Sequence, residues 1–145
     1  MEKFKGVYPV VITPMKENFE INYEGLKENV NYFINQKVSG LVINGSTGEF
    51  VSLTEKEKEE IIKTVISTVN GAFPIIVGTA SEYTNDAIRL TQSAENLGAD
   101  GVLVINSYYA HPTDEEIYHQ FKDIADSTSL PIMIYNNPFT TGIDI

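Results

Sequence analysis

The chain has 145 residues, of which 42% are hydrophobic and 21% are charged, with 20 acidic against 10 basic side chains and no cysteine. This composition is typical of one globular domain, which we place at residues 1–145, and its size allows a core without disulfides or a structural metal. The net charge of −10 repels phosphate backbones, so we expect no nucleic-acid partner. No apolar run approaches the roughly 20 residues that cross a bilayer, so we expect no membrane association and a cytoplasmic protein.

Short apolar runs rich in β-branched residues alternate with longer amphipathic stretches along the chain. Five of these runs predict buried strands: Val7–Thr13, Gly40–Asn44, Pro74–Gly78, Gly101–Ile105 and Pro131–Tyr135. Between them, residues 23–36 predict a helix after the cap Asn22, and another helix is expected after Thr84. The T-x-x-E boxes at residues 54–57 and 113–116 predict two more helix starts.

Alternation of helices with strands that are apolar on both sides indicates a parallel sheet covered by helices. An open dinucleotide-binding sheet would carry G-x-G-x-x-G after its first strand, but Val11-Ile12-Thr13-Pro14-Met15 stands there. We therefore predict an α/β fold of the (β/α)8 TIM-barrel type. Because a complete barrel takes about 250 residues, we expect the chain to supply only its N-terminal portion, with about five strands and four helices.

Residues that follow the predicted strands are the first candidates for chemistry, because function collects at the carboxyl ends of parallel strands. Gly45-Ser46-Thr47-Gly48-Glu49 follows the second strand and can present N–H and hydroxyl groups to a small carboxylate or phosphate. An ordinary strand-to-helix turn explains the same residues equally well. Tyr108 and Tyr109 follow the fourth strand and Tyr135 ends the fifth, where a tyrosine can transfer a proton or simply pack under a loop.

The remaining polar residues do not predict a site. His111 and His119 have no second ligand at metal spacing, so we expect neither a metal nor another cofactor. Arg89 and the charged run Glu55–Glu60 are expected to be solvated helix surface and nothing more.

Four motifs, each at a predicted strand end, resemble those of the pyruvate-dependent lyase family that includes dihydrodipicolinate synthase and N-acetylneuraminate lyase. They are Gly6-Val7 with Val11–Pro14, Gly45–Glu49, Tyr108-Tyr109 with Pro112, and Tyr135-Asn136-x-Pro138 with Thr141-Gly142. The resemblance implies a (β/α)8 barrel that assembles as a homo-oligomer, a dimer of tight dimers. It also implies a Schiff base between a lysine on the sixth strand and pyruvate or another 2-keto acid.

The resemblance further implies roles for individual residues. Ser46, Thr47 and Gly48 would bind the substrate carboxylate through hydroxyl and backbone N–H groups. Tyr135 would be the acid/base beside the Schiff base, and Ser46 would relay a proton between Tyr135 and Tyr109, which would reach in from the neighbouring subunit. In the family the Schiff-base lysine lies almost thirty residues beyond the tyrosine matched by Tyr135. The resemblance therefore implies no Schiff-base lysine in this chain and no activity of the chain alone.

The substrate stays open at this point. Dihydrodipicolinate synthases tend to carry an arginine where Thr140 stands, to hold the carboxylate of the second substrate, so Thr140 argues against that specific activity. The short connection from Glu49 to Leu53, in contrast, is closer to the synthase branch than to the neuraminate lyases. Dihydrodipicolinate synthase-like formation or cleavage of a C–C bond is one interpretation, and a sugar-acid aldolase or dehydratase is another. The sequence is also compatible with a catalytically inactive carboxylate-binding module and with a truncated fragment that has no function of its own.

Overall fold

The structure, a computed structural model, describes residues 4–145 and contains a four-stranded parallel sheet. The strands are β1 (Leu41–Ile43), β2 (Ile75–Gly78), β3 (Gly101–Ile105) and β4 (Ile132–Tyr135). The helices are α1 (Tyr23–Asn35), α2 (Glu55–Val69), α3 (Thr84–Asn96), α4 (Asp114–Asp126) and the short α5 (Pro138–Thr141). Two 3-10 turns, η1 (Ser46–Gly48) and η2 (Phe50–Ser52), follow β1. None of the helices described in this range is long and apolar enough to cross a membrane.

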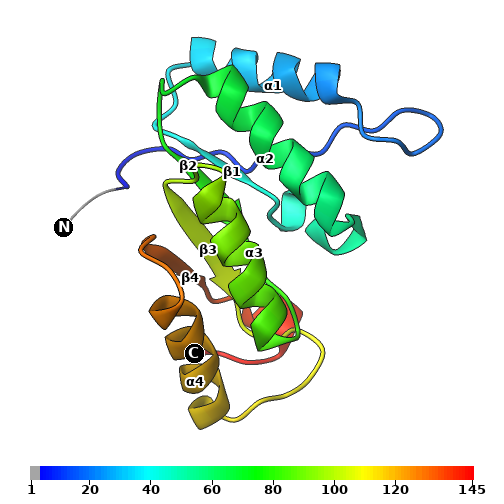
Figure 1. The fold of residues 1–145 in the computed structure, drawn as a ribbon. Helices are drawn as coiled ribbons and strands as arrows, with labels where there is room; N and C mark the ends of the chain where they lie inside the picture. Colours follow the sequence, from blue (N-terminus) through cyan, green and yellow to red (C-terminus); the bar gives the residue numbers. More distant parts are fainter. Residues whose placement is uncertain (1–3) are drawn as a thin grey trace.

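The strands pair in the order β1-β2-β3-β4, which is their order along the chain without a reversal. A crossover between parallel strands is right-handed, so this order places α2, α3 and α4 on the same side of the sheet. The helices also pack in sequence, α1 on α2, α2 on α3 and α3 on α4, as Figure 1 shows. A doubly wound sheet would reverse its strand order, so the arrangement is that of a barrel wall, as predicted.

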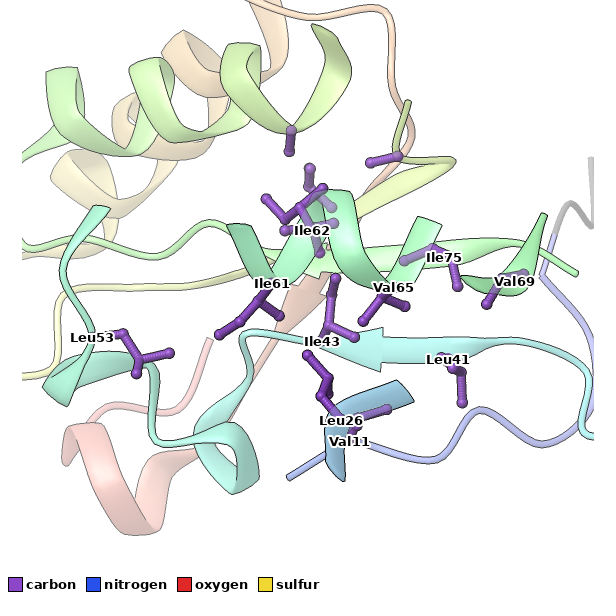
Figure 2. Packing of buried hydrophobic residues seen from close by; sticks show 14 of the residues in the cluster. Val11, Leu26, Leu41, Ile43, Leu53, Ile61, Ile62, Val65, Val69 and Ile75 are labelled. Carbon is purple, nitrogen blue, oxygen red and sulfur yellow. The ribbon is translucent and has the colours of Figure 1, made fainter. Parts of the chain in front are cut away.

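The main hydrophobic core fills the space between the sheet and the helices. Alternate strand residues such as Ile43 face the helices, and α2 covers them with Ile61 and Val65, which Figure 2 shows beside β1. Leu26 of α1 and the buried Val11 extend the same cluster. Full burial of one such side chain stabilises a fold by about 1.5–3 kcal/mol, so this layer holds the helices against the sheet.

The predicted helix starts are confirmed. The side-chain oxygen of Asn22 accepts a hydrogen bond from the N–H of Gly25 at 3.1 Å at the start of α1. Both halves of the capping box are present at residues 54–57 and at residues 113–116. These bonds satisfy N–H groups that a helix end otherwise leaves unpaired, so they fix where α2 and α4 begin and where the preceding loops end.

The prediction of a strand at Val7–Thr13 is wrong, because this segment forms only an isolated parallel bridge between Val10 and Val42. The N–H of Val42 donates to the carbonyl of Pro9 at 2.9 Å, and the N–H of Val11 donates to the carbonyl of Val42 at 2.8 Å. Proline has no N–H with which to continue the ladder. The segment therefore lies beside β1, and the sheet has four strands where five were predicted.

The prediction that every strand is buried on both faces is wrong for β4. Met133 is 38% exposed and Ile134 is 56% exposed. Within residues 4–145, β4 pairs with β3 on one side and with no strand on the other. The four predicted helices are all present, and the short α5 that follows β4 was not predicted.

Polar contacts join α2 to α3, which corrects the prediction that their charged residues are only solvated surface. The guanidinium of Arg89 binds the carboxylates of both Glu55 and Asp86, and these hydrogen bonds raise the pKa of Arg89. The hydroxyl of Ser93 donates to Glu59 at 2.9 Å. Because Arg89 is half exposed, we expect the ion pairs to add little stability and mainly to fix how the two helices are aligned.

Gly78 lies at the end of β2, where the backbone after β1 passes closest to it. A Cβ atom at Gly78 would lie 2.1 Å from the carbonyl oxygen of Asn44 and 3.3 Å from the backbone nitrogen of Gly45. We predict that Gly78→Ala lowers the free energy of unfolding by about 3 kcal/mol, since backbone must move to admit the methyl group. At Gly71 an added Cβ meets nothing within 4 Å and only its φ of +78° is strained, so Gly71→Ala should cost about 1 kcal/mol. Urea unfolding followed by circular dichroism compares the two variants, and equal losses would contradict the prediction.

The open edge of β4 predicts that the 145-residue chain self-associates when it is alone. Unpaired N–H and C=O groups at a sheet edge recruit other strands, and the exposed side chain of Ile134 adds apolar surface. Ile134→Lys should lower the mass measured by light scattering, because a charge on an edge strand opposes pairing. Tyr32→Lys, at an exposed position of α1, serves as the control that leaves the mass unchanged. A monodisperse monomer formed by the unsubstituted chain would refute this account of the edge.

Candidate functional site

The candidate residues lie at the last position of a strand or in the loops that follow the strands, at the carboxyl edge of the sheet. Left-handed backbone brackets the first of these loops, with φ of 53° at Asn44 and 58° at Glu49. Between these two residues, Ser46 and Thr47 are exposed in η1, whereas Gly48 is buried. No hydrogen bond within the described residues uses the N–H of Ser46 or Thr47. Both N–H groups and both hydroxyl groups are therefore available at the surface of the loop.

Hydrogen bonds to neighbouring segments hold this loop in place. The hydroxyl of Thr13 donates to the carbonyl of Gly48 at 2.7 Å in a buried position. The side-chain amide of Asn44 donates to the carbonyl of Lys58 in α2 at 3.3 Å. Together with the close approach of Gly78 to Asn44, these contacts tie the loop to the segment before α1, to α2 and to β2.

Tyr135 is the last residue of β4, and its ring packs in a small second core cluster with Phe50, Ala80, Ile105 and Tyr108. The residue is partly buried and reaches this cluster from the strand at the open edge of the sheet. Its environment is therefore apolar around the ring, while its hydroxyl lies near polar groups of the next loop.

The Tyr135 hydroxyl accepts a hydrogen bond from the side-chain amide of Asn137 at 3.0 Å. The same amide nitrogen donates to the hydroxyl of Thr140 at 2.9 Å. Because an amide N–H can only donate, the phenol oxygen is the acceptor in this bond and its own proton stays available. Asn137 was not among the predicted site residues, and only its place two residues after Tyr135 could have indicated it.

Ser46 and Tyr135 line the same small pocket, although β2 and β3 lie between their loops along the chain. The pocket has a volume of about 10 Å³, and its other lining residues include Gly78, Phe50 and Ile105. No hydrogen bond within the described residues joins the two side chains to each other. Thr47, Gly48 and Tyr109 are not among the residues that line this pocket. The fold thus brings two of the five predicted site residues together and leaves the other three outside the pocket.

Tyr108 and Tyr109 point in different directions. The ring of Tyr108 meets Phe50 edge to face, with centroids 6.0 Å apart, and burial raises its pKa, with the charge of Glu82 raising it further. Tyr109 is 88% exposed. The first tyrosine therefore belongs to the packing under the site, and the second extends away from the chain.

Glu82, in the loop between β2 and α3, binds the loop that carries these tyrosines. One carboxylate oxygen accepts from the N–H of Tyr108 at 2.7 Å and from the N–H of Tyr109 at 3.0 Å, and the other accepts from the hydroxyl of Ser107 at 2.5 Å. Glu82 was not predicted as a site residue. Its position after the third predicted strand, at the same edge as the other candidates, was the signal that could have found it.

Lys58 on α2 differs from the expectation of a solvated lysine. Its ammonium lies 5.7 Å from the centre of the Phe50 ring, and the residue is half buried. Burial lowers the pKa of Lys58, and the charge of Glu55 opposes this shift. Lys58 does not line the pocket of Ser46 and Tyr135, so its contact with the site is indirect, through the Phe50 ring.

In the described part of the chain, two buried side-chain oxygens, those of Asn44 and Asn106, have no hydrogen-bond partner among residues 4–145. Both residues directly follow a strand, β1 and β3 respectively, and lie at the carboxyl edge of the sheet, where the candidate site is. Unpaired buried polar atoms are uncommon in folded proteins.

Within residues 4–145, no three or more His, Asp or Glu side chains come together as a metal site, and His119 lies on the exposed surface of α4.

A sequence profile of the dihydrodipicolinate synthetase family matches residues 3–145. The 4-hydroxy-tetrahydrodipicolinate synthase of Methanocaldococcus jannaschii is 44% identical over 142 residues, which are 98% of this chain and 49% of that protein. The corresponding enzyme of Oceanobacillus iheyensis is 40% identical over 142 residues, which are 98% of this chain and 48% of that protein.

Solved structures of such proteins are also similar to this chain. Dihydrodipicolinate synthase from Acinetobacter baumannii, complexed with pyruvate, superposes with a TM-score of 0.94 at 37% identity, over 96% of this chain and 48% of that chain. YagE, a prophage protein of the same family from E. coli K12, also in complex with pyruvate, gives a TM-score of 0.94 at 35% identity, over 97% of this chain and 47% of that chain.

The chain spans about half the length of the relatives it matches. Its four parallel strands in chain order, with helices on one side, are part of the TIM barrel of those relatives. The profile match across the chain and the shared fold lead to one conclusion: the chain belongs to the dihydrodipicolinate synthetase family.

Proposed function

We propose that this chain provides the carboxylate-binding and proton-transferring part of a Schiff-base lyase that acts on pyruvate or another 2-keto acid. The observation that supports this most directly is the pocket at the carboxyl edge of the sheet, where Ser46 after β1 meets Tyr135 at the end of β4. Function in TIM barrels is located at this edge. Two relatives with the same fold were solved with pyruvate bound, which supports the choice of substrate.

In this proposal Ser46 and Thr47 bind the substrate carboxylate, and Gly48, whose N–H donates to the carbonyl of Gly45 at 3.0 Å, shapes the turn that presents them. The N–H groups of Ser46 and Thr47 are unused within the described residues, and their hydroxyls are exposed beside them. Consecutive N–H groups in a tight turn form a concave anion site. The contacts of Thr13 and Gly78 fix the turn, so these donors would be in place before the substrate arrives.

Tyr135 is the proposed acid/base. A protonated imine withdraws electrons, so that the neighbouring carbon can lose a proton and form an enamine, and a nearby phenol can move that proton. The bond from Asn137 to the Tyr135 oxygen leaves the phenol proton free to be donated. Ser46, which lines the same pocket, is the proposed relay toward Tyr109.

The pocket of about 10 Å³ holds no more than one water molecule, so it is the floor of a keto-acid site and not the whole of it. No lysine of residues 4–145 lines it. We therefore propose that the Schiff-base lysine and the remaining walls come from the second half of the barrel. The completed barrel is defined here as this chain combined with the part of the Methanocaldococcus jannaschii synthase that it does not match.

We also propose a homo-oligomer in which Tyr109 serves the site of a neighbouring subunit. Tyr109 is 88% exposed and lies outside the pocket of its own chain, which is the arrangement that such a role requires. A dimer of tight dimers, as the family resemblance implies, would provide that neighbour. A cytoplasmic location is part of the same proposal.

A sugar-acid aldolase or dehydratase is the second candidate, and Thr140 favours it. Synthases of the family tend to carry an arginine at this position, whereas the Thr140 hydroxyl accepts from Asn137 and carries no charge for a second carboxylate. A catalytically inactive carboxylate-binding module is the candidate function that is not enzymatic. Turnover assays of the completed barrel with pyruvate and aldehydes of both classes separate the three.

We predict that Tyr135→Phe in the completed barrel lowers kcat by about 10² to 10⁴, because it removes one general acid/base while keeping the ring in place. Ser46→Ala should have a milder effect if a water molecule replaces its hydroxyl. Steady-state kinetics gives kcat and KM for each variant. A Tyr135→Phe variant whose kcat stays within a few-fold of the parent would mean that the ring only packs.

We predict that borohydride reduction in the presence of pyruvate leaves no adduct on this chain, because no lysine of residues 4–145 lines the pocket. Lys58 is the critical lysine, since burial lowers its pKa. Mass spectrometry of the completed barrel should locate the adduct on the other half. An adduct on this chain that disappears in Lys58→Arg would identify Lys58 as the nucleophile and refute the assignment.

A further inference from the structure

The loop between β3 and α4 carries both tyrosines, and few other contacts hold its backbone. Within the described residues, no backbone–backbone hydrogen bond involves residues 107–112. The N–H groups of Tyr108 and Tyr109 both donate to one oxygen of Glu82, at 2.7 and 3.0 Å. The hydroxyl of Ser107 donates to the other oxygen. A single carboxylate therefore binds three consecutive residues of this loop.

The backbone around Glu82 is itself well anchored. The N–H of Thr79 donates to the carbonyl of Leu103 in β3 at 3.1 Å. The hydroxyl of Thr79 is hydrogen-bonded to the hydroxyl of Thr91 in α3 at 2.9 Å, and both residues are buried. Thr79, three residues before Glu82, is thus fixed both to β3 and to α3, and α3 itself begins at Thr84, two residues after Glu82, so the short segment that carries Glu82 lies between two anchored elements.

We propose that Glu82 is a positioning residue that fixes the loop of residues 107–109 and thereby the direction of Tyr109. Two consecutive N–H groups bound to one oxygen define the orientation of the peptide planes before and after Tyr108. With the ring of Tyr108 packed on Phe50, the side chain of Tyr109 is directed outward, where it is 88% exposed. The catalytic part of this inference rests on the proposed role of Tyr109.

Glu82 is suited to this role because it is a carboxylate. Hydrogen bonds to a charged acceptor are about twice as strong as those between neutral groups. An ordered Tyr109 also loses less side-chain and backbone freedom when it enters a neighbouring site, so an anchored loop lowers the cost of assembling that site.

Glu95, at the C-terminal part of α3, offers a matched control. Its carboxylate accepts from the hydroxyls of Thr128 and Ser129 and from the N–H of Ser129, and so holds the loop before β4. That loop lies at the opposite edge of the sheet from Tyr109. Glu82→Ala and Glu95→Ala therefore remove the same kind of contact, a carboxylate bound to a loop, at opposite edges of the sheet.

The first measurement is amide hydrogen exchange in the completed barrel. Glu82→Ala should speed exchange at the Tyr108 and Tyr109 N–H groups about tenfold, the factor expected for losing a hydrogen bond to a charged group, and leave Ser129 unchanged. Glu95→Ala should do the reverse. Glu82→Gln keeps one acceptor oxygen and should give an intermediate rate. Unchanged exchange at both tyrosines in Glu82→Ala would overturn the proposal whether or not the protein has activity.

The second measurement is turnover. Glu82→Ala should lower kcat about tenfold and keep KM for pyruvate within about twofold of the parent. Glu82→Gln should retain most of the kcat that Glu82→Ala loses, and Glu95→Ala should have the kcat of the parent.

The variant with both Glu82→Ala and Tyr109→Phe should be no slower than Tyr109→Phe alone, because Glu82 acts through Tyr109. Faster exchange with unchanged kcat, or additive losses in the double variant, would overturn the positioning role. A completed barrel without any turnover would refute the proposed function, and the exchange rates alone would then decide whether Glu82 fixes the loop.

Discussion

Parallel pairing of β1, β2, β3 and β4 in the order of the chain is the constraint on which the other features depend. This order leaves the helices on one side of the sheet and brings the carboxyl ends of all four strands to one edge. Residues as distant as Ser46 and Tyr135 reach the same pocket only because the strands that precede them are aligned in this way. The close contact between Gly78 and Asn44 sets the fine position of the first loop within that arrangement.

The site contains both rigid and exposed parts, and the difference follows from packing. The turn of residues 45–48 and the ring of Tyr108 are fixed by buried neighbours, whereas Tyr109, Met133 and Ile134 are exposed within residues 4–145. In a barrel of about eight strands these exposed groups are where a neighbouring strand or subunit would pack. These exposed surfaces support the proposal that the second half of a barrel and a neighbouring subunit cover them.

Local sequence signals predicted most of the fold. The capping boxes at Thr54 and Thr113 and the apolar runs of β1 to β4 act through short-range chemistry, so their positions could be predicted within a few residues. To predict that Val7–Thr13 is not a strand, one would have to know that the ladder requires an N–H from Pro9. To predict the role of Glu82, one would have to know the distance between two loops separated by β3. Neither is visible in hydrophobic periodicity, because both depend on which segments become neighbours in space. The predicted roles of Ser46, Thr47 and Tyr135 came from a resemblance, and they stay predictions.

We propose above that Ser46 and Thr47 bind the carboxylate of a keto acid at the carboxyl edge of the sheet and that Tyr135 transfers its proton. A crystal structure of the completed barrel with bound pyruvate tests it most directly. The account predicts the carboxylate of pyruvate on the N–H groups of Ser46 and Thr47, with the Tyr135 hydroxyl within about 3 Å of the reacting carbonyl group. Pyruvate bound at another edge of the barrel, or bound here with Tyr135 beyond hydrogen-bonding reach, would contradict it.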